Sequence, residues 1–97
     1  MPVRKAIVHS AIGLHARPAA VFVRAVTETG LPVTISKEGK PGVDARSLLE
    51  VMTEDFPNGC EVELAVAADA LPDRYTLAAA EDALNGLRAL LESAPGR

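Results

Sequence analysis

The spacing of hydrophobic residues along the 97-residue chain alternates between a period of two and a period near four. These periods predict strands and helices respectively. The clearest strand covers residues 60–66, in which every second residue from Cys60 to Val66 is apolar. Glu61 and Glu63 occupy positions between them. We expect the acidic face of this strand to meet water and its apolar face to meet helices.

Two longer segments show helical spacing. Residues 16–29 place apolar side chains on one face, which predicts a helix that packs on a sheet and stops at Gly30. The apolar positions on that face are Ala19, Phe22, Val23 and Val26. Leucine and alanine recur in steps of three and four from Leu77 to Leu91, which predicts a long final helix. We expect residues 93–97 to fray.

Shorter patterns complete the order of elements. They are residues 3–9 and 31–37 for two strands, residues near 40–43 for a brief strand, and residues 47–52 or 47–53 for a short helix. In the first strand, Ile7 and Val8 cannot both face inward. The resulting order, βαββαβα, predicts an α+β fold in which helices cover one face of an antiparallel sheet.

Composition narrows the class of protein. The length and the 48% hydrophobic content predict a single domain, residues 1–97, with one core. One cysteine excludes an internal disulfide and fits a reducing cytosol. No apolar run approaches the roughly 20 residues that cross a bilayer, and the N-terminus lacks a signal-peptide pattern. We therefore expect a cytoplasmic protein without membrane insertion.

The net charge of −3 is unevenly distributed. Residues 1–46 carry seven basic and three acidic side chains, a balance of +4, whereas residues 47–97 carry three basic and ten acidic side chains, a balance of −7. A basic first half suits acidic partner surfaces and phosphoryl groups. The basic residues are not clustered and only three residues are aromatic, so nucleic-acid binding is not expected.

The run from Gly13 to Ala19 carries the candidate chemistry. Pro18 marks the first turn of a helix, which places His15 at the helix threshold and Arg17 beside it. The free N–H groups of a first helical turn, together with an arginine, form a site for anions such as phosphate. An ordinary histidine has a pKa of about 6.5, and a helix N-terminus disfavours the imidazolium, so the ring is suited to act as a nucleophile.

A phosphoryl group on this ring would find several donors nearby. The amides of Ala16 and Arg17 and the Arg17 guanidinium can bind its oxygens at the turn opened by Pro18. The same donors would stabilise the charge of a phosphoryl-transfer transition state. The transfer requires no cofactor and no metal ion held by this chain.

At these residues the sequence resembles HPr, the family of histidine-containing phosphocarriers of the bacterial phosphoenolpyruvate-dependent sugar phosphotransferase system. The segment from Val43 to Met52 resembles the second signature of the family, a short helix opened by a serine. The segment from Asn58 to Val62 resembles the turn and the strand that follow. The resemblance covers roughly residues 3–92, and the two motifs occur in the family's order.

The resemblance implies a fold and a function. The fold is an open-faced β-sandwich, a four-stranded antiparallel sheet covered on one face by three helices. In the family, the histidine matching His15 accepts a phosphoryl group from phosphorylated enzyme I and passes it to the IIA component of sugar permeases, assisted by the residue matching Arg17. Such a protein is a carrier and not a stand-alone turnover enzyme, and we expect it to be a monomer.

Further residues are assigned by the same resemblance. The serine matching Ser47 is phosphorylated by a separate serine kinase in some members. The residues that we expect to bind partner proteins are Ala20, Arg24, Leu48, Leu49 and Met52.

Structural explanations for these residues stay open. Ser47 is also a good N-cap, and the nearby acidic residues Glu50, Glu54 and Asp55 would repel a phosphoserine. The three apolar residues of the short helix fit a buried face as well as an exposed patch, and we expect at least one of them in the core.

Alternative functions also remain. A non-catalytic α+β binding module would have no reason to combine His15 with Arg17 at a helix start. A metal site built from His9, His15 and Cys60 matches no zinc spacing. Within the family, a nitrogen-regulatory or a dihydroxyacetone-kinase phosphorelay would use the same histidine motif. The segment 68–75 is an insertion relative to the usual family pattern, which leaves the start of the last helix open.

Overall fold

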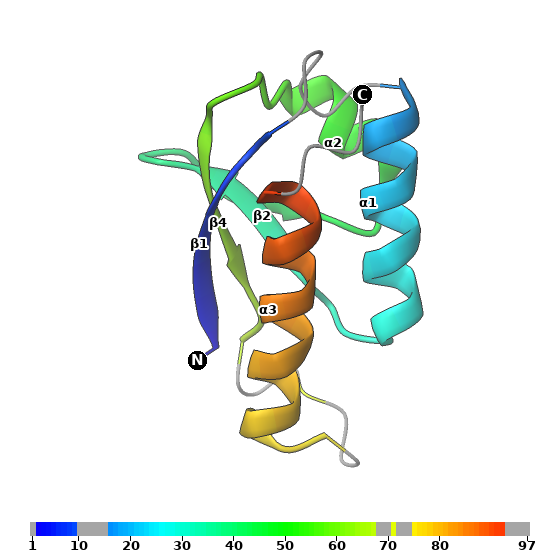
Figure 1. The fold of residues 1–97 in the computed structure, drawn as a ribbon, viewed down its shortest axis with the longest axis vertical. Helices are drawn as coiled ribbons and strands as arrows, with labels where there is room; N and C mark the ends of the chain where they lie inside the picture. Colours follow the sequence, from blue (N-terminus) through cyan, green and yellow to red (C-terminus); the bar gives the residue numbers. More distant parts are fainter. Residues whose placement is uncertain (1, 10–15, 68–70, 72–74, 93–97) are drawn as a thin grey trace.

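The computed structural model describes residues 2–9, 16–67, 71 and 75–92. These residues form seven elements in the predicted βαββαβα order (Figure 1). They are β1 (Val3–Ile7), α1 (Ala16–Thr29), β2 (Thr34–Lys37), β3 (Val43–Asp44), α2 (Leu48–Glu54), β4 (Glu61–Ala65) and α3 (Leu77–Glu92). The fold is the α+β open-faced sandwich that the sequence predicts.

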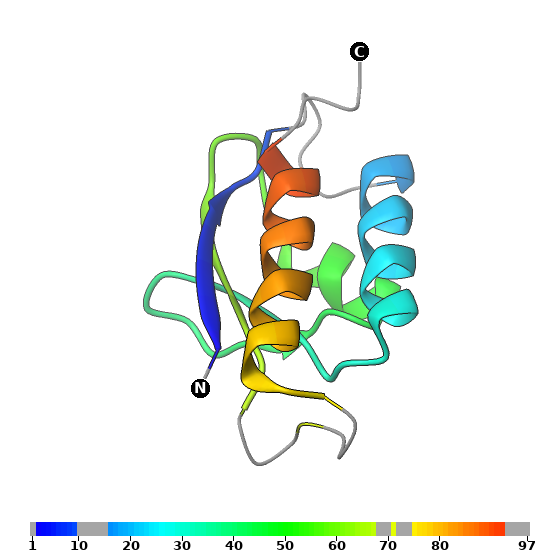
Figure 2. The same ribbon diagram turned by 60° about the horizontal axis from the view of Figure 1, so that its bottom comes forward.

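The four strands form one antiparallel sheet in the order β1-β4-β2-β3. The first and last strands of the chain therefore lie side by side, and Ile7 is paired with Glu61. On its other side β4 pairs with β2, where Lys37 is opposite Val62. The helices α1 and α3 cover one face of this sheet (Figures 1 and 2). No helix among the described residues covers the other face.

The core fills the space between the sheet and the helices. Phe22 of α1, Leu64 of β4 and Leu84 of α3 are all at most 1% exposed. In β1 and the residue after it, Val8 is fully buried whereas Ile7 is 36% exposed, as the sequence predicts. The predicted faces of β4 are also confirmed, because its apolar side chains are buried and the two glutamates are not.

Several strands are shorter than predicted, for local reasons. The Val33 N–H bonds to the carbonyl of Leu31, and this tight turn delays the start of β2 to Thr34. The Lys40 N–H bonds to the carbonyl of Lys37, and this turn delays β3 to residue 43. The short helix ends at Glu54, whereas the sequence predicts an end at residue 52 or 53.

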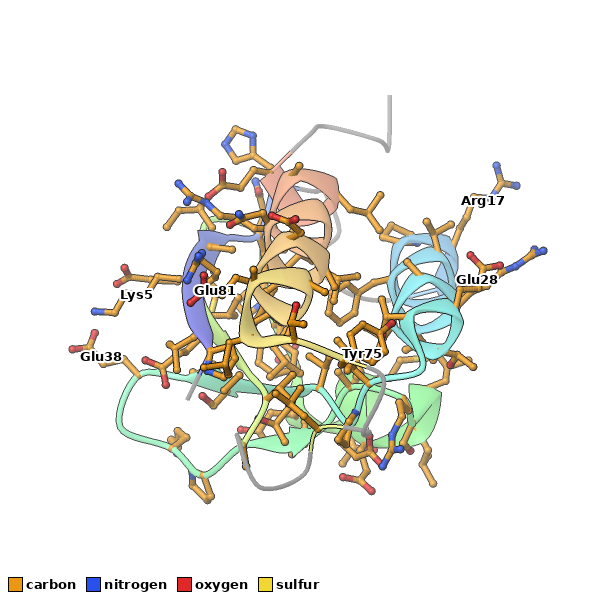
Figure 3. All side chains as sticks on the ribbon, turned by 90° about the horizontal axis from the view of Figure 1, so that it is seen from below. Lys5, Arg17, Glu28, Glu38, Tyr75 and Glu81 are labelled. Atoms are coloured by element: carbon orange, nitrogen blue, oxygen red, sulfur yellow. The ribbon has the colours of Figure 1, made fainter. Side chains whose placement is uncertain are left out.

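The segment before α3 is tied to the end of α1. The Tyr75 hydroxyl donates a hydrogen bond to the Thr29 carbonyl, and Tyr75 lies between the two helices (Figure 3). Gly30, with a φ of 73°, ends α1 as expected, because glycine adopts this conformation without strain. Of the predicted insertion at 68–75, the structure describes only Leu71 and Tyr75. Residues 10–15, which include His15, and residues 93–97, for which fraying is predicted, lie outside the described residues.

Candidate functional site

The first turn of α1 carries the described part of the candidate site. The helix begins at Ala16, so Pro18 occupies the first turn, as predicted. Arg17 is exposed, and its side chain points away from the body of the molecule (Figure 3). The first turn contains no acidic residue, so no carboxylate of its own neutralises the positive end of the helix. His15 and the side chain of Ala16 lie outside the described residues.

The inner face of α1 fixes this turn in place. Ala19, Phe22 and Val26 are at most 1% exposed, which anchors the helix on the core from its first turn onward. The outer face carries Ala20 and Arg24, which are both exposed, and their role in partner binding stays a prediction. Nε of Arg24 lies 3.3 Å from Oε2 of Glu28 one turn later.

Ser47 is the N-cap of α2, which confirms the capping prediction. Its backbone is extended, and its Oγ accepts a hydrogen bond of 3.2 Å from the amide of Glu50. The Glu50 carboxylate accepts a hydrogen bond of 3.1 Å from the amide of Asp44, which ties α2 to β3. Phosphorylation of Ser47 stays a prediction.

An ion pair lies directly before this cap. Nε of Arg46 is 3.0 Å from Oδ1 of Asp44. The hydrogen bond from the Arg46 side chain lowers the pKa of the Asp44 carboxyl group, and the same contact raises the pKa of Arg46. The cation next to Ser47 is therefore engaged with a carboxylate.

The exposed apolar side chains of α2 form a patch, which we call the α2 patch: Leu48, Leu49 and Met52. They are 40%, 76% and 36% exposed. The prediction that at least one of them belongs to the core is therefore wrong. The helix is only two turns long, and Val51 is its one buried side chain. Phe56 is fully buried directly after the helix and supplies core volume in place of the patch.

The C-terminal end of α2 is held by a residue that the sequence analysis missed. The ammonium of Lys37, at the end of β2, donates hydrogen bonds of 2.9 Å to the carbonyl of Glu54 and 3.1 Å to that of Asp55. It also lies 5.8 Å from the centre of the Phe56 ring. Seventeen residues separate Lys37 from Glu54, so no local spacing signals this contact.

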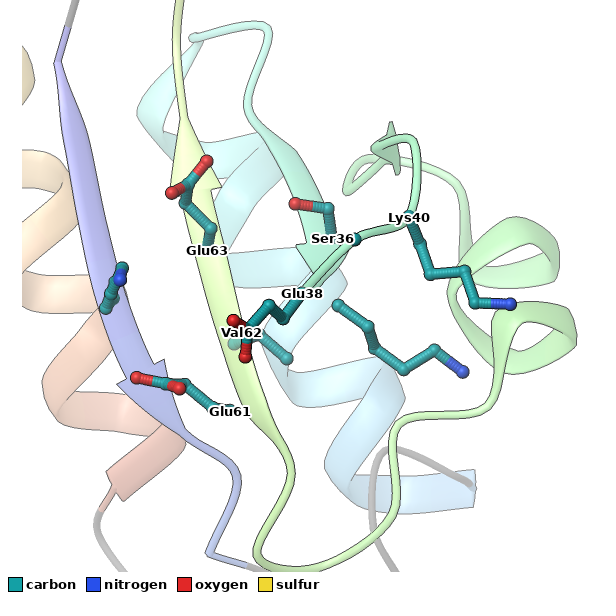
Figure 4. A pocket seen from close by; sticks show the side chains of 9 residues that line it. Ser36, Glu38, Lys40, Glu61, Val62 and Glu63 are labelled. Carbon is teal, nitrogen blue, oxygen red and sulfur yellow. The ribbon is translucent and has the colours of Figure 1, made fainter.

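A shallow pocket of about 170 Å³ lies beside β4 and the end of β2 (Figure 4). None of the residues that line it belongs to α1 or α2. Its charged lining mixes both signs and consists of Lys5, Lys37, Lys40, Glu38, Glu61 and Glu63. It is therefore separate from the anion site predicted at the start of α1.

The described residues also bear on metal binding and on membrane insertion. Within residues 2–9, 16–67, 71 and 75–92, no group of three or more His, Cys, Asp or Glu side chains is placed to hold a metal ion. No helix in this part of the chain is long and apolar enough to span a bilayer. The Cys60 thiol is partly buried, and this burial raises its pKa.

The helix start, the capped α2 and the order of the elements agree with one known family. The family described as PTS HPr component, phosphorylation site, matches residues 3–93. The chain belongs to the HPr family.

Individual HPr proteins support this assignment. The chain is 48% identical to the phosphocarrier protein HPr of Streptomyces coelicolor over 69 residues, which cover 71% of this chain and 74% of the relative. It is 36% identical to the phosphocarrier protein HPr of Borreliella burgdorferi over 56 residues, which cover 58% of this chain and 64% of the relative.

Solved HPr structures share the fold. HPr-C-His from Thermoanaerobacter tengcongensis superposes with a TM-score of 0.74 at 27% identity, over 94% of this chain and 91% of that chain. The phosphocarrier protein HPr of Bacillus anthracis superposes with a TM-score of 0.68 at 27% identity, over 93% of this chain and 95% of that chain.

Proposed function

We propose that the chain is a phosphocarrier that accepts a phosphoryl group on His15 from phosphorylated enzyme I and passes it to the IIA component of a sugar permease. The observation that carries this proposal is the exposed Arg17 in the carboxylate-free first turn of α1, in a chain of the HPr family. His15 directly precedes that turn in the sequence. The nucleophile and its anion-binding donors are thus neighbours along the chain.

The transfer uses few groups. The lone pair of His15 Nδ1 attacks phosphorus in line, the new N–P bond forms, and the bond to the donor breaks with its electron pair left on the donor. Arg17 and the free amides at the start of α1 bind the equatorial oxygens while negative charge redistributes. Onward transfer to the IIA component runs through the same geometry in reverse. The carrier must therefore not over-stabilise its phosphorylated state.

The exposed surfaces of α1 and α2 supply the docking face in this proposal. The α2 patch exposes three apolar side chains on a helix that packs against α1. Contiguous exposed apolar side chains are typical of protein interaction sites. Ala20 and Arg24 on the outer face of α1 extend this surface. Two partners that use one face must bind in turn, which suits a monomeric carrier, and the proposed exchange with enzyme I and a IIA component would take place in the cytoplasm.

Labelling with phosphoenolpyruvate and enzyme I tests the assignment. We expect one phosphoryl group per chain in the wild type and none in a His15→Ala variant. A His9→Ala variant is the matched control, because His9 is the second histidine of the chain and is exposed. Labelling that persists in His15→Ala, or that is lost in His9→Ala alone, would contradict the proposal.

The role of Arg17 has its own test. An Arg17→Ala variant should accept the phosphoryl group at least about tenfold more slowly, because a charge-assisted hydrogen bond to the phosphoryl oxygens is lost. Arg88→Ala is the control, since Arg88 lies on α3 and pairs with Glu92. Equal transfer rates in the two variants would remove Arg17 from the site.

A further inference from the structure

The two ends of α2 are held by different means. Seven residues are too few for a helix to persist by its own backbone bonds. Packing contributes little, because Val51 is the single buried side chain of the helix. The N-terminal end is fixed by the Ser47 cap and by the Glu50 carboxylate on the Asp44 amide. The order of the α2 patch therefore depends on what holds the other end.

The other end of α2 is bound by a charged group from the sheet. Nζ of Lys37 donates to two successive carbonyls, those of Glu54 and Asp55, at 2.9 and 3.1 Å. Carbonyls at a helix C-terminus lack intrahelical partners and carry the negative end of the helix dipole, so a cation is well matched to them. Phe56 beneath the ammonium places an aromatic ring within cation–π range.

The backbone at this end adds a second, independent observation. Asp55 is the non-glycine residue with positive φ among the described residues, at φ 67° and ψ 93°. An L-residue in this region is strained unless its surroundings hold it there. Because Lys37 bonds to the carbonyl of Asp55 itself, it holds the strained residue in the conformation that ends α2.

We propose that Lys37 is a positioning residue for partner binding: its ammonium fixes the C-terminal end of α2 and thereby orders the α2 patch. Met52 lies two residues before the carbonyl that Lys37 binds. Loosening this end therefore disorders the patch before it disturbs the core. The inference rests on the proposed function only in its assumption that partners dock on α2.

Hydrogen exchange tests the structural half without any partner. In a Lys37→Met variant, which keeps most of the length of the side chain, the amides of α2 should exchange at least about tenfold faster, as expected for the loss of two charge-assisted hydrogen bonds. Amides of β4 and α3 should keep their rates. Lys37→Arg, which retains the charge and the donors, should restore protection. Lys40→Met is the matched control, because Lys40 is an exposed lysine three residues away.

Transfer kinetics test the functional half. With phosphorylated enzyme I as donor, Lys37→Met should raise the KM for the carrier at least about twofold and leave kcat unchanged, because the KM rises as the ordered, docking-competent fraction of α2 falls while the chemical step stays the same. Lys37→Arg should return KM toward that of the wild type. A wild type that accepts no label refutes the proposed function, whereas the exchange result still decides whether Lys37 fixes α2.

Three results would overturn the proposal. The first is unchanged exchange of α2 amides in Lys37→Met. The second is faster exchange of every amide, which would show that Lys37 supports the whole fold and not one helix end. The third is faster exchange of α2 with an unchanged KM, which would separate Lys37 from docking. If Lys37→Met does not fold, Lys37→Gln, which removes the positive charge but keeps a polar side chain, carries the same measurements.

Discussion

The helices α2 and α3 use apolar residues in opposite ways. In α3, Leu84, Leu87 and Leu91 face the sheet and are at most 4% exposed. In α2, one side chain faces the core and three apolar side chains face solvent. Both helices have apolar residues at helical spacing, yet α3 stabilises the fold and α2 exposes its apolar residues on the surface. The difference lies in how each helix is held: α3 by burial, and α2 by contacts at its ends.

The largest expected effect separates the two helices by stability. Leu84→Ala should lower the free energy of unfolding by about 2–5 kcal/mol, because it removes a fully buried side chain and leaves a cavity. Leu49→Ala should change it by less than about 0.5 kcal/mol, because that side chain is 76% exposed. Urea denaturation of both variants measures the contrast, and similar losses would erase it.

For partner binding we expect the opposite, namely that changes in α2 matter more than changes in α3. A Leu49→Ser, Met52→Ser variant should raise the KM for transfer from enzyme I about tenfold, which corresponds to roughly 1.4 kcal/mol, since its apolar contact area is lost. Leu77→Ser is the control, because Leu77 is an exposed leucine of α3. Steady-state transfer rates at varied carrier concentration give the KM. An equal increase in the control would show that no specific face is involved.

The cap of α2 gives the next effect in size. Ser47→Ala should destabilise the chain by about 1 kcal/mol, the usual cost of removing an N-cap acceptor. The cause is the lost bond between Ser47 Oγ and the amide of Glu50. Ser47→Asp, which supplies another acceptor at the cap, should retain most of the stability in thermal or urea unfolding. A larger loss in Ser47→Asp than in Ser47→Ala would contradict the capping role.

Relief of strain at the other end has the opposite sign. Asp55→Gly should stabilise the chain by about 0.5–1 kcal/mol, because glycine takes the positive φ of this position without a steric penalty. The flexibility of glycine in the unfolded chain reduces the gain. Differential scanning calorimetry measures the shift in Tm. A lower Tm would mean that contacts of the Asp55 side chain outweigh its backbone strain.

The smallest effect is a pH dependence. Because Arg46 lowers the pKa of folded Asp44, their pair contributes stability above the unfolded pKa of about 3.9, and this stability is lost as the pH falls through the folded pKa. Both side chains are well exposed, so the contribution should not exceed about 0.5 kcal/mol. Asp44→Asn should therefore be slightly less stable than the wild type at neutral pH and equal to it in acid. A stability difference between Asp44→Asn and the wild type that grows as the pH falls would contradict a stabilising ion pair.

The sequence predicts most of the fold because burial follows periodicity. Leu84, Leu87 and Leu91 of α3 are buried as their spacing predicts, whereas Leu77 at the start of the helix is exposed. The alternation in β4 appears at its predicted positions, and Pro18 correctly marks the first turn of α1. Periodicity does not predict which side chains are buried when a helix is only two turns long. In α2, a spacing of one and four residues fits either face, and only the tertiary fold turns Val51 inward and leaves Leu49 out.

The candidate site was predicted unevenly for the same reason. The Ser47 cap follows from a local pattern and is confirmed. Arg17 lies in the first turn of α1, as the position of Pro18 predicts, and its role at the site stays a prediction. Lys37 acts on carbonyls 17 and 18 residues away, and the positive φ of Asp55 belongs to a residue type that usually avoids it. Neither leaves a periodic or motif signal. Contacts between a side chain and a distant backbone require the folded structure.

A chase experiment tests the carrier function most directly. The chain is first labelled through enzyme I and freed of the donor, and a IIA domain is then added while phosphohistidine is followed by ³¹P NMR and peptide mapping. The account predicts one phosphoryl group per chain, all of it on His15, which moves to the IIA domain. A label on another residue, or a label on His15 that the IIA domain cannot remove, would contradict it.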